Sequence, residues 1–176
     1  MKHVRDLFKT PTPVLRVPER KDGADIWELV RACKPLDENS MYCNLLQCDH
    51  FRDTCVVAEL DGKVVGWVSA YVLPYDPQTL FVWQVAVSSD ARGCGLGSLM
   101  LNHLIGRDAC EDVTRLQTTI TSDNQASWSL FRRFASQRDA NVDVQAYFTQ
   151  ALHFRERHET EHMMTIQLEE QLRKAA

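Results

Sequence analysis

The chain has 176 residues and a formal net charge of −4, with 44% hydrophobic and 25% charged residues. This length and composition suit one globular domain with a substantial core. The acidic balance argues against tight binding to nucleic acid or to an anionic membrane, and it is compatible with a cationic small substrate.

The cysteines and the apolar runs indicate the compartment. None of the six cysteines forms a C-x-x-C pair, and the first residues contain no stretch resembling a signal peptide. The longest apolar run, residues 80–87, is far too short to span a membrane as a helix. We therefore expect a cytoplasmic protein with reduced thiols and no membrane segment.

The first third of the chain predicts a short strand and two helices. Residues 1–13 are expected to be a loose lead-in, followed by a strand at 14–17. A helix should begin at Asp22 or Asp25 and stop before Pro35. A second helix should follow 36–42 and end near Cys48, and its capping by Asn39 or Ser40 is as good an explanation of that segment as a functional one.

The middle of the chain predicts a β-hairpin and a central strand. The runs 54–60 and 63–72 are β-rich and meet at Asp61-Gly62, a strong hairpin signal. Pro74 and Pro77 are expected to end this hairpin. Residues 80–87 are almost all apolar, aromatic or β-branched, which predicts a strand covered on both faces.

A glycine-rich loop, Arg92-Gly93-Cys94-Gly95-Leu96-Gly97, follows the central strand and opens a helix carrying Leu99, Met100, Leu104 and Ile105 at helical spacing. Alternate glycines let the backbone approach an anion, and the first N–H groups of the helix point at it. A phosphate or pyrophosphate site is the favoured interpretation, with an ordinary strand-to-helix turn as the alternative. The spacing fits neither a Walker loop nor a dinucleotide fingerprint.

The last third predicts a strand at 114–121 and then a helix opened by Ser122-Asp123-Asn124. Another strand is expected around Tyr147-Phe148, with Leu152 and Phe154. The segment 158–162 matches H-E-x-x-H, but 163–168 alternates as a strand, and histidines four residues apart in a strand lie about 13 Å apart. We expect no metal there, although a helix continuing through 169–172 would restore a zinc site.

Taken together, these motifs resemble the GNAT superfamily of N-acetyltransferases. Arg-x-x-Gly-x-Gly after a strand resembles its acetyl-CoA pyrophosphate motif, and the likeness covers roughly 14–168, which we expect to be a single domain followed by a tail at 169–176. It implies the GNAT fold of the α+β or α/β class, with a mixed, mostly antiparallel central sheet flanked by helices. Within that superfamily, further stretches look like the L-2,4-diaminobutyrate acetyltransferase family of ectoine biosynthesis: 36–42, 50–51, 54–59, 80–87, 92–96, 118–127 and 158–161.

The resemblance implies transfer of an acetyl group from acetyl-CoA to the side-chain amine of L-2,4-diaminobutyrate, giving a precursor of the osmoprotectant ectoine. It also implies a homodimer. Residues at matching positions would hold the cofactor, the pantetheine arm along Val85 and Val87, and the pyrophosphate on the glycine loop. The full set is Val85, Val87, Arg92, Gly93, Cys94, Gly95, Leu96, Gly97, Asn124 and Ser127, although helix capping explains the last two equally well.

The same resemblance places the substrate among Asp37, Tyr42, Trp83, His158 and Glu161. Asp37 and Glu161 would hold the ammonium groups, and Glu161 is the candidate general base for direct attack within a ternary complex. Tyr42 and His158 would supply hydrogen bonds. Trp83 would line the alkyl chain, although simple core packing is the commoner role for a tryptophan.

Two departures leave alternatives open. Many GNAT enzymes carry a tyrosine four residues after the position of Ser127 that protonates the leaving thiolate, and this chain has Phe131. The end at 161–164 also lacks the tyrosine that this family is expected to carry. The alternatives are an acetyltransferase of another small amine or polyamine, or a non-catalytic sensor that binds acyl-CoA.

Overall fold

The computed structural model describes residues 12–168. The tail expected at 169–176 and all but the end of the expected lead-in lie outside the described residues. The strands are β1 (Val14–Arg16), β2 (Val56–Leu60), β3 (Lys63–Leu73), β4 (Asp76–Val87), β5 (Arg115–Thr121), β6 (Val142–Phe148) and β7 (Glu161–Gln167). The helices are α1 (Gly23–Ala32), α2 (Met41–His50), α3 (Leu96–Ile105) and α4 (Gln125–Ser136).

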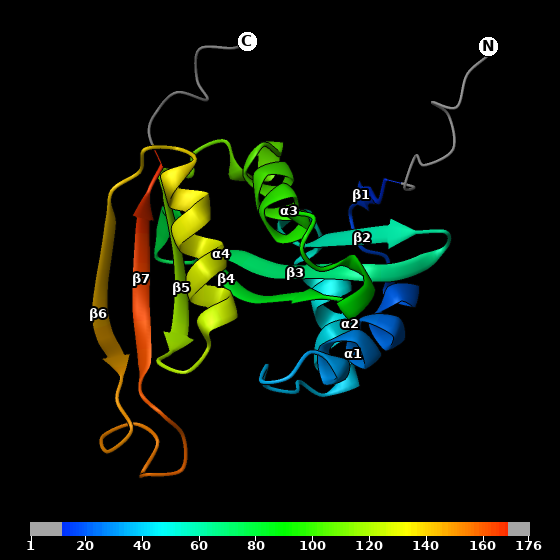
Figure 1. Ribbon diagram of the computed structural model, residues 1–176. Coiled ribbons are helices and arrows are strands. Elements are labelled where there is room, and N and C mark those ends of the chain that lie inside the picture. The colour runs from blue at the N-terminus through cyan, green and yellow to red at the C-terminus, as the bar shows by residue number, and fades with distance from the viewer. Residues whose placement is uncertain (1–11, 169–176) are drawn as a thin grey trace, which may run out of the picture.

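The strands form one seven-stranded sheet in the order β1-β2-β3-β4-β5-β7-β6. Every neighbouring pair is antiparallel except β4 and β5, which are parallel. In Figure 1, β2, β3 and β4 run across the molecule, whereas β5, β7 and β6 stand nearly upright beside them. The sheet therefore turns sharply where its single parallel pair joins the two halves.

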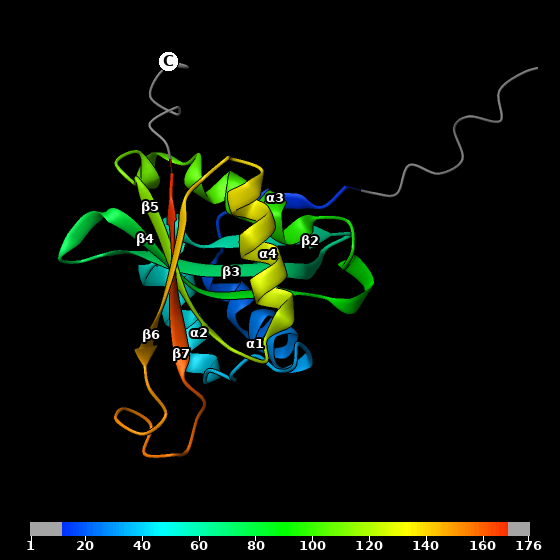
Figure 2. The same ribbon diagram turned by 60° about the vertical axis from the view of Figure 1, so that its left-hand side comes forward.

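Helices cover the two faces of the sheet with separate cores. On one face, α3 and α4 pack against strand residues such as Val68, Leu80 and Ile166. On the other face, α1 and α2 pack against Val57, Trp67 and Ala86. Figure 2 shows α4 lying across one side of the strands and α1 and α2 on the other. This mixed sheet with flanking helices confirms the predicted fold class.

Local sequence signals account for several elements. The β2–β3 turn is the predicted hairpin, and both Asp61 (φ 50°) and Gly62 (φ 75°) adopt the left-handed conformation that such a two-residue turn requires. Helix α2 begins after Ser40, whose Oγ accepts a hydrogen bond from the Cys43 amide at 3.1 Å. The capping role proposed for this segment is therefore present.

Three expectations about the strands were wrong. Pro77 does not precede the central strand but lies inside it, because β4 begins at Asp76 and pairs with β3 as a second hairpin. The central strand is not covered on both faces along its length, since 48% of Trp83 is exposed. The strand expected around Tyr147-Phe148 ends at Phe148, whereas Leu152 and Phe154 lie in turns of the β6–β7 connection.

Candidate functional site

A β-bulge at Trp83 shapes the central strand. Ser69 of β3 pairs with Gln84 and its neighbour Ala70 pairs with Val82, so Trp83 is the extra residue. Because side chains alternate along a strand, one extra residue exchanges the two faces. Leu80 and Val82 before the bulge therefore join the α3–α4 core, and Val85 and Val87 after it pack against the same core.

Strands β4 and β5 separate shortly after they meet. Their parallel pairing covers only 79–81 with 115–117. Arg115 fixes the paired end: its Nη2 donates to Asp76 Oδ2 at 2.8 Å and its Nε to Thr79 Oγ1 at 3.0 Å. Beyond Phe81 the two strands diverge, and a cleft opens between 82–85 of β4 and 118–121 of β5.

A second cleft lies at the glycine-rich loop. Gly93 and Gly95 have φ of 81° and 80°, and Gly95 is the N-cap of α3, whose first N–H groups face outward. The guanidinium of Arg92 is tied to the strand, since its Nε donates to the Val87 carbonyl at 2.9 Å. Of the predicted cofactor residues, the structure brings nine together here: Val85, Val87, Arg92, Gly93, Gly95, Leu96, Gly97, Asn124 and Ser127.

Cys94 is the member of that set that does not line the cleft. Its side chain is exposed, and its Sγ donates to the Ala91 carbonyl at 3.0 Å. The role of Cys94 in binding the cofactor therefore stays a prediction. The expected capping role is present, since Asn124 Oδ1 caps α4 by accepting from the Ser127 amide at 3.1 Å. Both residues also line the two clefts, and their role in binding the cofactor stays a prediction.

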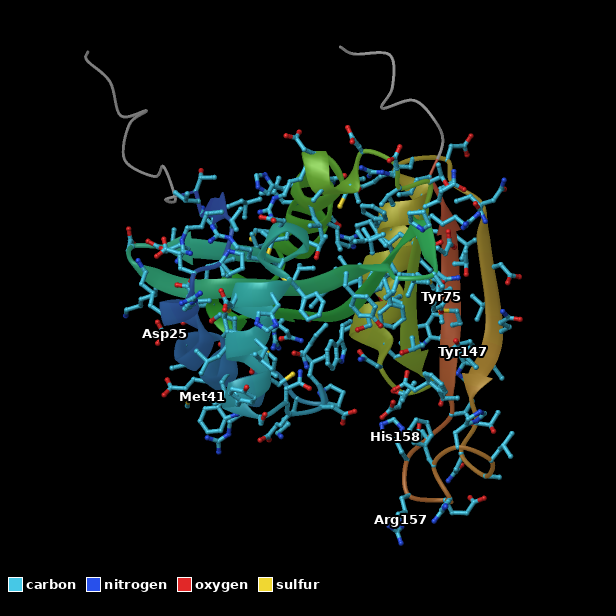
Figure 3. The ribbon with its side chains drawn as sticks, turned by 180° about the vertical axis from the view of Figure 1, so that it is seen from behind. Asp25, Met41, Tyr75, Tyr147, Arg157 and His158 are labelled. Carbon is cyan, nitrogen blue, oxygen red and sulfur yellow. The ribbon has the colours of Figure 1, made fainter. Side chains whose placement is uncertain are left out.

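The cleft between β4 and β5 holds most of the predicted substrate residues. Asp37, Trp83, His158 and Glu161 all line it. His158 Nε2 lies 3.4 Å from Asp37 Oδ2 and 3.9 Å from Glu161 Oε1, so one imidazole stands between two carboxylates. Figure 3 shows His158 in the β6–β7 connection, which brings this ring to the end of the sheet.

The two ionisable groups at the centre of this cluster have shifted pKa values. Burial raises the pKa of Glu161, and its Oε2 is buried without a hydrogen-bond partner. The pKa of His158 is raised first by the hydrogen bond between its Nδ1 and the Glu159 carbonyl (2.8 Å), and further by the charges of Asp37 and Glu161. A carboxyl with a raised pKa is suited to accept a proton near neutral pH.

One of the predicted substrate residues lies away from both clefts. Tyr42 lies on α2 with 69% of its surface exposed, and it lines neither cleft, so its role stays a prediction. Trp83 is not packed in the core, since about half of it is exposed at the cleft. Phe131, where a tyrosine was considered, is buried and lines the same cleft.

The H-E-x-x-H segment does not form a helix. Strand β7 starts at Glu161, inside the motif. His158 faces Asp37, whereas the His162 ring packs near Trp128, with ring centroids 6.4 Å apart. Within residues 12–168, no group of three or more His, Cys, Asp or Glu side chains is arranged to hold a metal ion. The helix considered at 169–172 lies outside the described residues.

Sequence reasoning named Asp37 in the loop that joins α1 to α2, but it missed other residues of this loop that line the clefts and the residue of β4 that bonds to it. Pro35 and Leu36 line both clefts, and Asn39 lines the cleft between β4 and β5. Gln84, buried on β4, lines that same cleft. One signal was available: Gln84 is the single polar residue in the run 80–87.

Comparison with known proteins agrees with this geometry. Residues 23–135 match the acetyltransferase (GNAT) family, and this match covers more than half of the chain. The chain belongs to the GNAT family. The chain is therefore an acetyl-CoA-dependent N-acetyltransferase.

Among GNAT proteins, the chain is similar to L-2,4-diaminobutyric acid acetyltransferases. It is 44% identical over 160 residues to the one from Methylotuvimicrobium alcaliphilum, covering 90% of this chain and 93% of that protein. It is 53% identical over 135 residues to the one from Bordetella parapertussis, covering 76% and 73%. The solved diaminobutyrate acetyltransferase from Paenibacillus lautus, in complex with L-2,4-diaminobutyric acid and coenzyme A, superposes with a TM-score of 0.84 at 40% identity, covering 89% and 95%.

Within residues 12–168, no helix is both long enough and apolar enough to cross a membrane.

Proposed function

We propose that this acetyltransferase moves the acetyl group of acetyl-CoA to the 4-amino group of L-2,4-diaminobutyrate, giving N4-acetyl-L-2,4-diaminobutyrate for ectoine biosynthesis. The observation that carries the proposal is the meeting of two clefts. The cleft at the glycine-rich loop and the cleft holding the carboxylates share Pro35, Leu36, Val85, Asn124 and Ser127 as common walls. A thioester entering along Val85 would therefore arrive beside the acidic cluster.

The chemistry of the second cleft matches this substrate. Diaminobutyrate carries two ammonium groups and one carboxylate, so its site needs acidic groups and an apolar wall. Asp37 and Glu161 supply negative charge, and the exposed Trp83 supplies the wall for the alkyl chain. Relatives that share 40 to 53% identity with this chain are named for this substrate.

The reaction follows as direct attack of the amine on the thioester within a ternary complex, where proximity lowers the barrier. The amine must first lose a proton, and Glu161, with its raised pKa, is the base that receives it directly or through one water. A backbone N–H of β4, which has no strand partner on the β5 side beyond Phe81, stabilises the oxyanion. Phe131 offers no proton to the departing thiolate, so solvent supplies it.

The wider setting is part of the same proposal. The catalytic unit is one domain spanning 14–168, the protein is a homodimer in the cytoplasm, and its product serves osmoprotection. These points rest on the family resemblance. Size-exclusion chromatography with light scattering checks the dimer, and a monomer at micromolar concentration would contradict it.

The decisive assay measures free thiol when the protein is mixed with acetyl-CoA and L-2,4-diaminobutyrate. We expect thiol release, and NMR of the product should show acetylation at N4 and not at N2. Release with a polyamine but not with diaminobutyrate would favour an acetyltransferase of another amine. CoA binding without turnover on any amine would favour the acyl-CoA sensor.

A further inference from the structure

Gln84 is a buried amide at the edge of the substrate cleft. It follows the bulge residue Trp83 on β4, and only 6% of it is exposed. Its Nε2 donates to the main-chain carbonyl of Asp37 at 2.8 Å, and its Oε1 accepts from Asn39 Nδ2 at 3.4 Å. Both ends of the amide are therefore bonded to the loop that joins α1 to α2.

The bulge decides which way this amide points. Without the extra residue, alternation would place residue 84 on the same face as Leu80 and Val82, inside the α3–α4 core. With the bulge, Gln84 joins the face of Ala86, on the side of α1. The central strand thus directs a hydrogen-bonding side chain toward the loop.

The loop has other attachments to the interior, since Leu36, the neighbour of Asp37, packs against the α1–α2 core. Trp27 Nε1 donates to the Asn39 carbonyl at 3.0 Å. The ion pairs of Glu38 with Arg31 and Lys34 lie on the surface and contribute little to stability. Gln84 holds Asp37 through its main chain, by the hydrogen bond to its carbonyl.

The Asp37 carboxylate depends on that attachment for its position. Its side chain is 81% exposed, so packing does not fix it, and yet its Oδ2 lies 3.4 Å from His158 Nε2. The charged or titratable side chains facing His158 are Asp37 from the loop and Glu161 from β7, while Phe154 packs on the ring at 4.5 Å between centroids. A shift of the loop would therefore move one of the two carboxylates away from the imidazole.

We propose that Gln84 is a positioning residue of the amine site, which holds the Asp37 loop against the central strand and so sets the distance between Asp37 and His158. The role in amine binding rests on the proposed function. The placement of Asp37 beside His158 does not, because it concerns only the chain's own residues.

The test replaces Gln84 by Met, which keeps the length of the side chain but removes both hydrogen bonds. NMR titration of the His158 ring in the full-length protein should give a pKa below that of the wild type, approaching that of Asp37→Asn. In the Asp37→Asn background, Gln84→Met should lower it no further, because the carboxylate that it positions is gone. In steady-state assays the KM for diaminobutyrate should rise roughly tenfold, while the KM for acetyl-CoA stays within about twofold.

Gln47→Met is the matched control. Gln47 is also a buried glutamine, bonded to Asn44 at 3.0 Å on α2, but it lines neither cleft. It should leave the His158 titration unchanged. If Gln84→Met does not fold, Asn39→Ala, which removes only the longer bond, should lower the His158 pKa by a smaller amount.

An unchanged His158 pKa in a folded Gln84→Met protein would overturn the proposal. So would equal increases in KM for both substrates, or a further drop in the Asp37→Asn background. Failure of the proposed function has a different signature: the wild-type protein would release no thiol with diaminobutyrate, while the His158 titration would still report on Gln84.

Discussion

Replacing Glu161 by Gln should lower activity and raise stability together. As the proposed base, Glu161 is worth about 10²- to 10⁴-fold in rate, the usual contribution of a positioned general base. Its side chain is 18% exposed, its Oε2 has no hydrogen-bond partner, and burial raises its pKa. Where Glu161 is ionised, the burial that raises its pKa also disfavours its charge, and the neutral amide removes that penalty. The variant should therefore recover about 1 kcal/mol, or about 2–4 °C in Tm.

The pH dependence of this gain has a definite sign. Because the folded-state pKa of Glu161 is raised, the folded protein binds the proton more tightly than the unfolded chain. The stabilising effect of protonation is fully present below the unfolded pKa and is lost as pH rises through the folded pKa. The advantage of Glu161→Gln should therefore be largest near about pH 8 and vanish near about pH 4.

Two measurements check this reasoning. Thermal denaturation of both proteins across the pH range gives the difference in Tm, and thiol release gives kcat/KM. Glu159→Gln is the matched control, because the Glu159 side chain is exposed two residues away, and it accepts a hydrogen bond from Ser122 Oγ at 3.3 Å. It should match the wild type in both assays. Wild-type turnover by Glu161→Gln would remove Glu161 from the role of base, and a variant less stable than wild type near about pH 8 would refute the burial penalty.

Three further predictions follow from particular side chains. Trp83→Ala should raise the KM for the amine about tenfold yet cost less than about 1 kcal/mol of stability, because Trp83 is half exposed. Trp67→Ala, at 0% exposure, should cost about 3–5 kcal/mol in the same denaturation assay, and equal losses of stability in the two variants would contradict this. Gly95→Ala should cost about 1–2 kcal/mol of stability through its φ of 80° alone, since an added Cβ meets nothing within 4 Å, and it should raise the KM for acetyl-CoA. Gly106→Ala, at the C-cap of the same helix, should be nearly neutral in both assays. Dialysis against a chelator should leave thiol release unchanged, because residues 12–168 contain no group of three or more His, Cys, Asp or Glu side chains arranged to hold a metal ion. Loss of activity on dialysis, restored by added zinc, would contradict this.

Local signals in the sequence were sufficient for the elements that short-range chemistry determines. Asp61-Gly62 predicted the hairpin because both residues tolerate the left-handed turn, and the glycines at 93 and 95, both with positive φ, predicted the loop that opens α3. The strand that begins inside the H-E-x-x-H segment was predicted from the alternation of residues 163–168. In each case the residues that decide the conformation lie within a few positions of one another.

Features that depend on pairing between distant segments were missed. Pro77 indicates a break when read locally, but it is tolerated near the start of β4, where the pairing with β5 begins only at Thr79. The bulge at Trp83 is visible only in the register with β3, so the sequence could not assign Trp83 to the cleft or turn Gln84 toward the loop. Tyr42 was placed by resemblance alone, and the packing of α2 leaves it exposed on this chain.

Because β4 separates from β5, the stability of this protein should depend on the concentration of acetyl-CoA. From Val82 to Val87 the central strand has β3 on one side, and none of these residues is paired with β5 on the other side. If the pantetheine arm binds that edge as an added strand, the co-substrate completes the sheet that it reacts on. Acetyl-CoA at about 100 times its Kd would then add about 2.7 kcal/mol to the free energy of unfolding. A cell with ample acetyl-CoA would thus keep more of this protein folded, whereas a cell depleted of acetyl-CoA would lose folded enzyme together with its co-substrate.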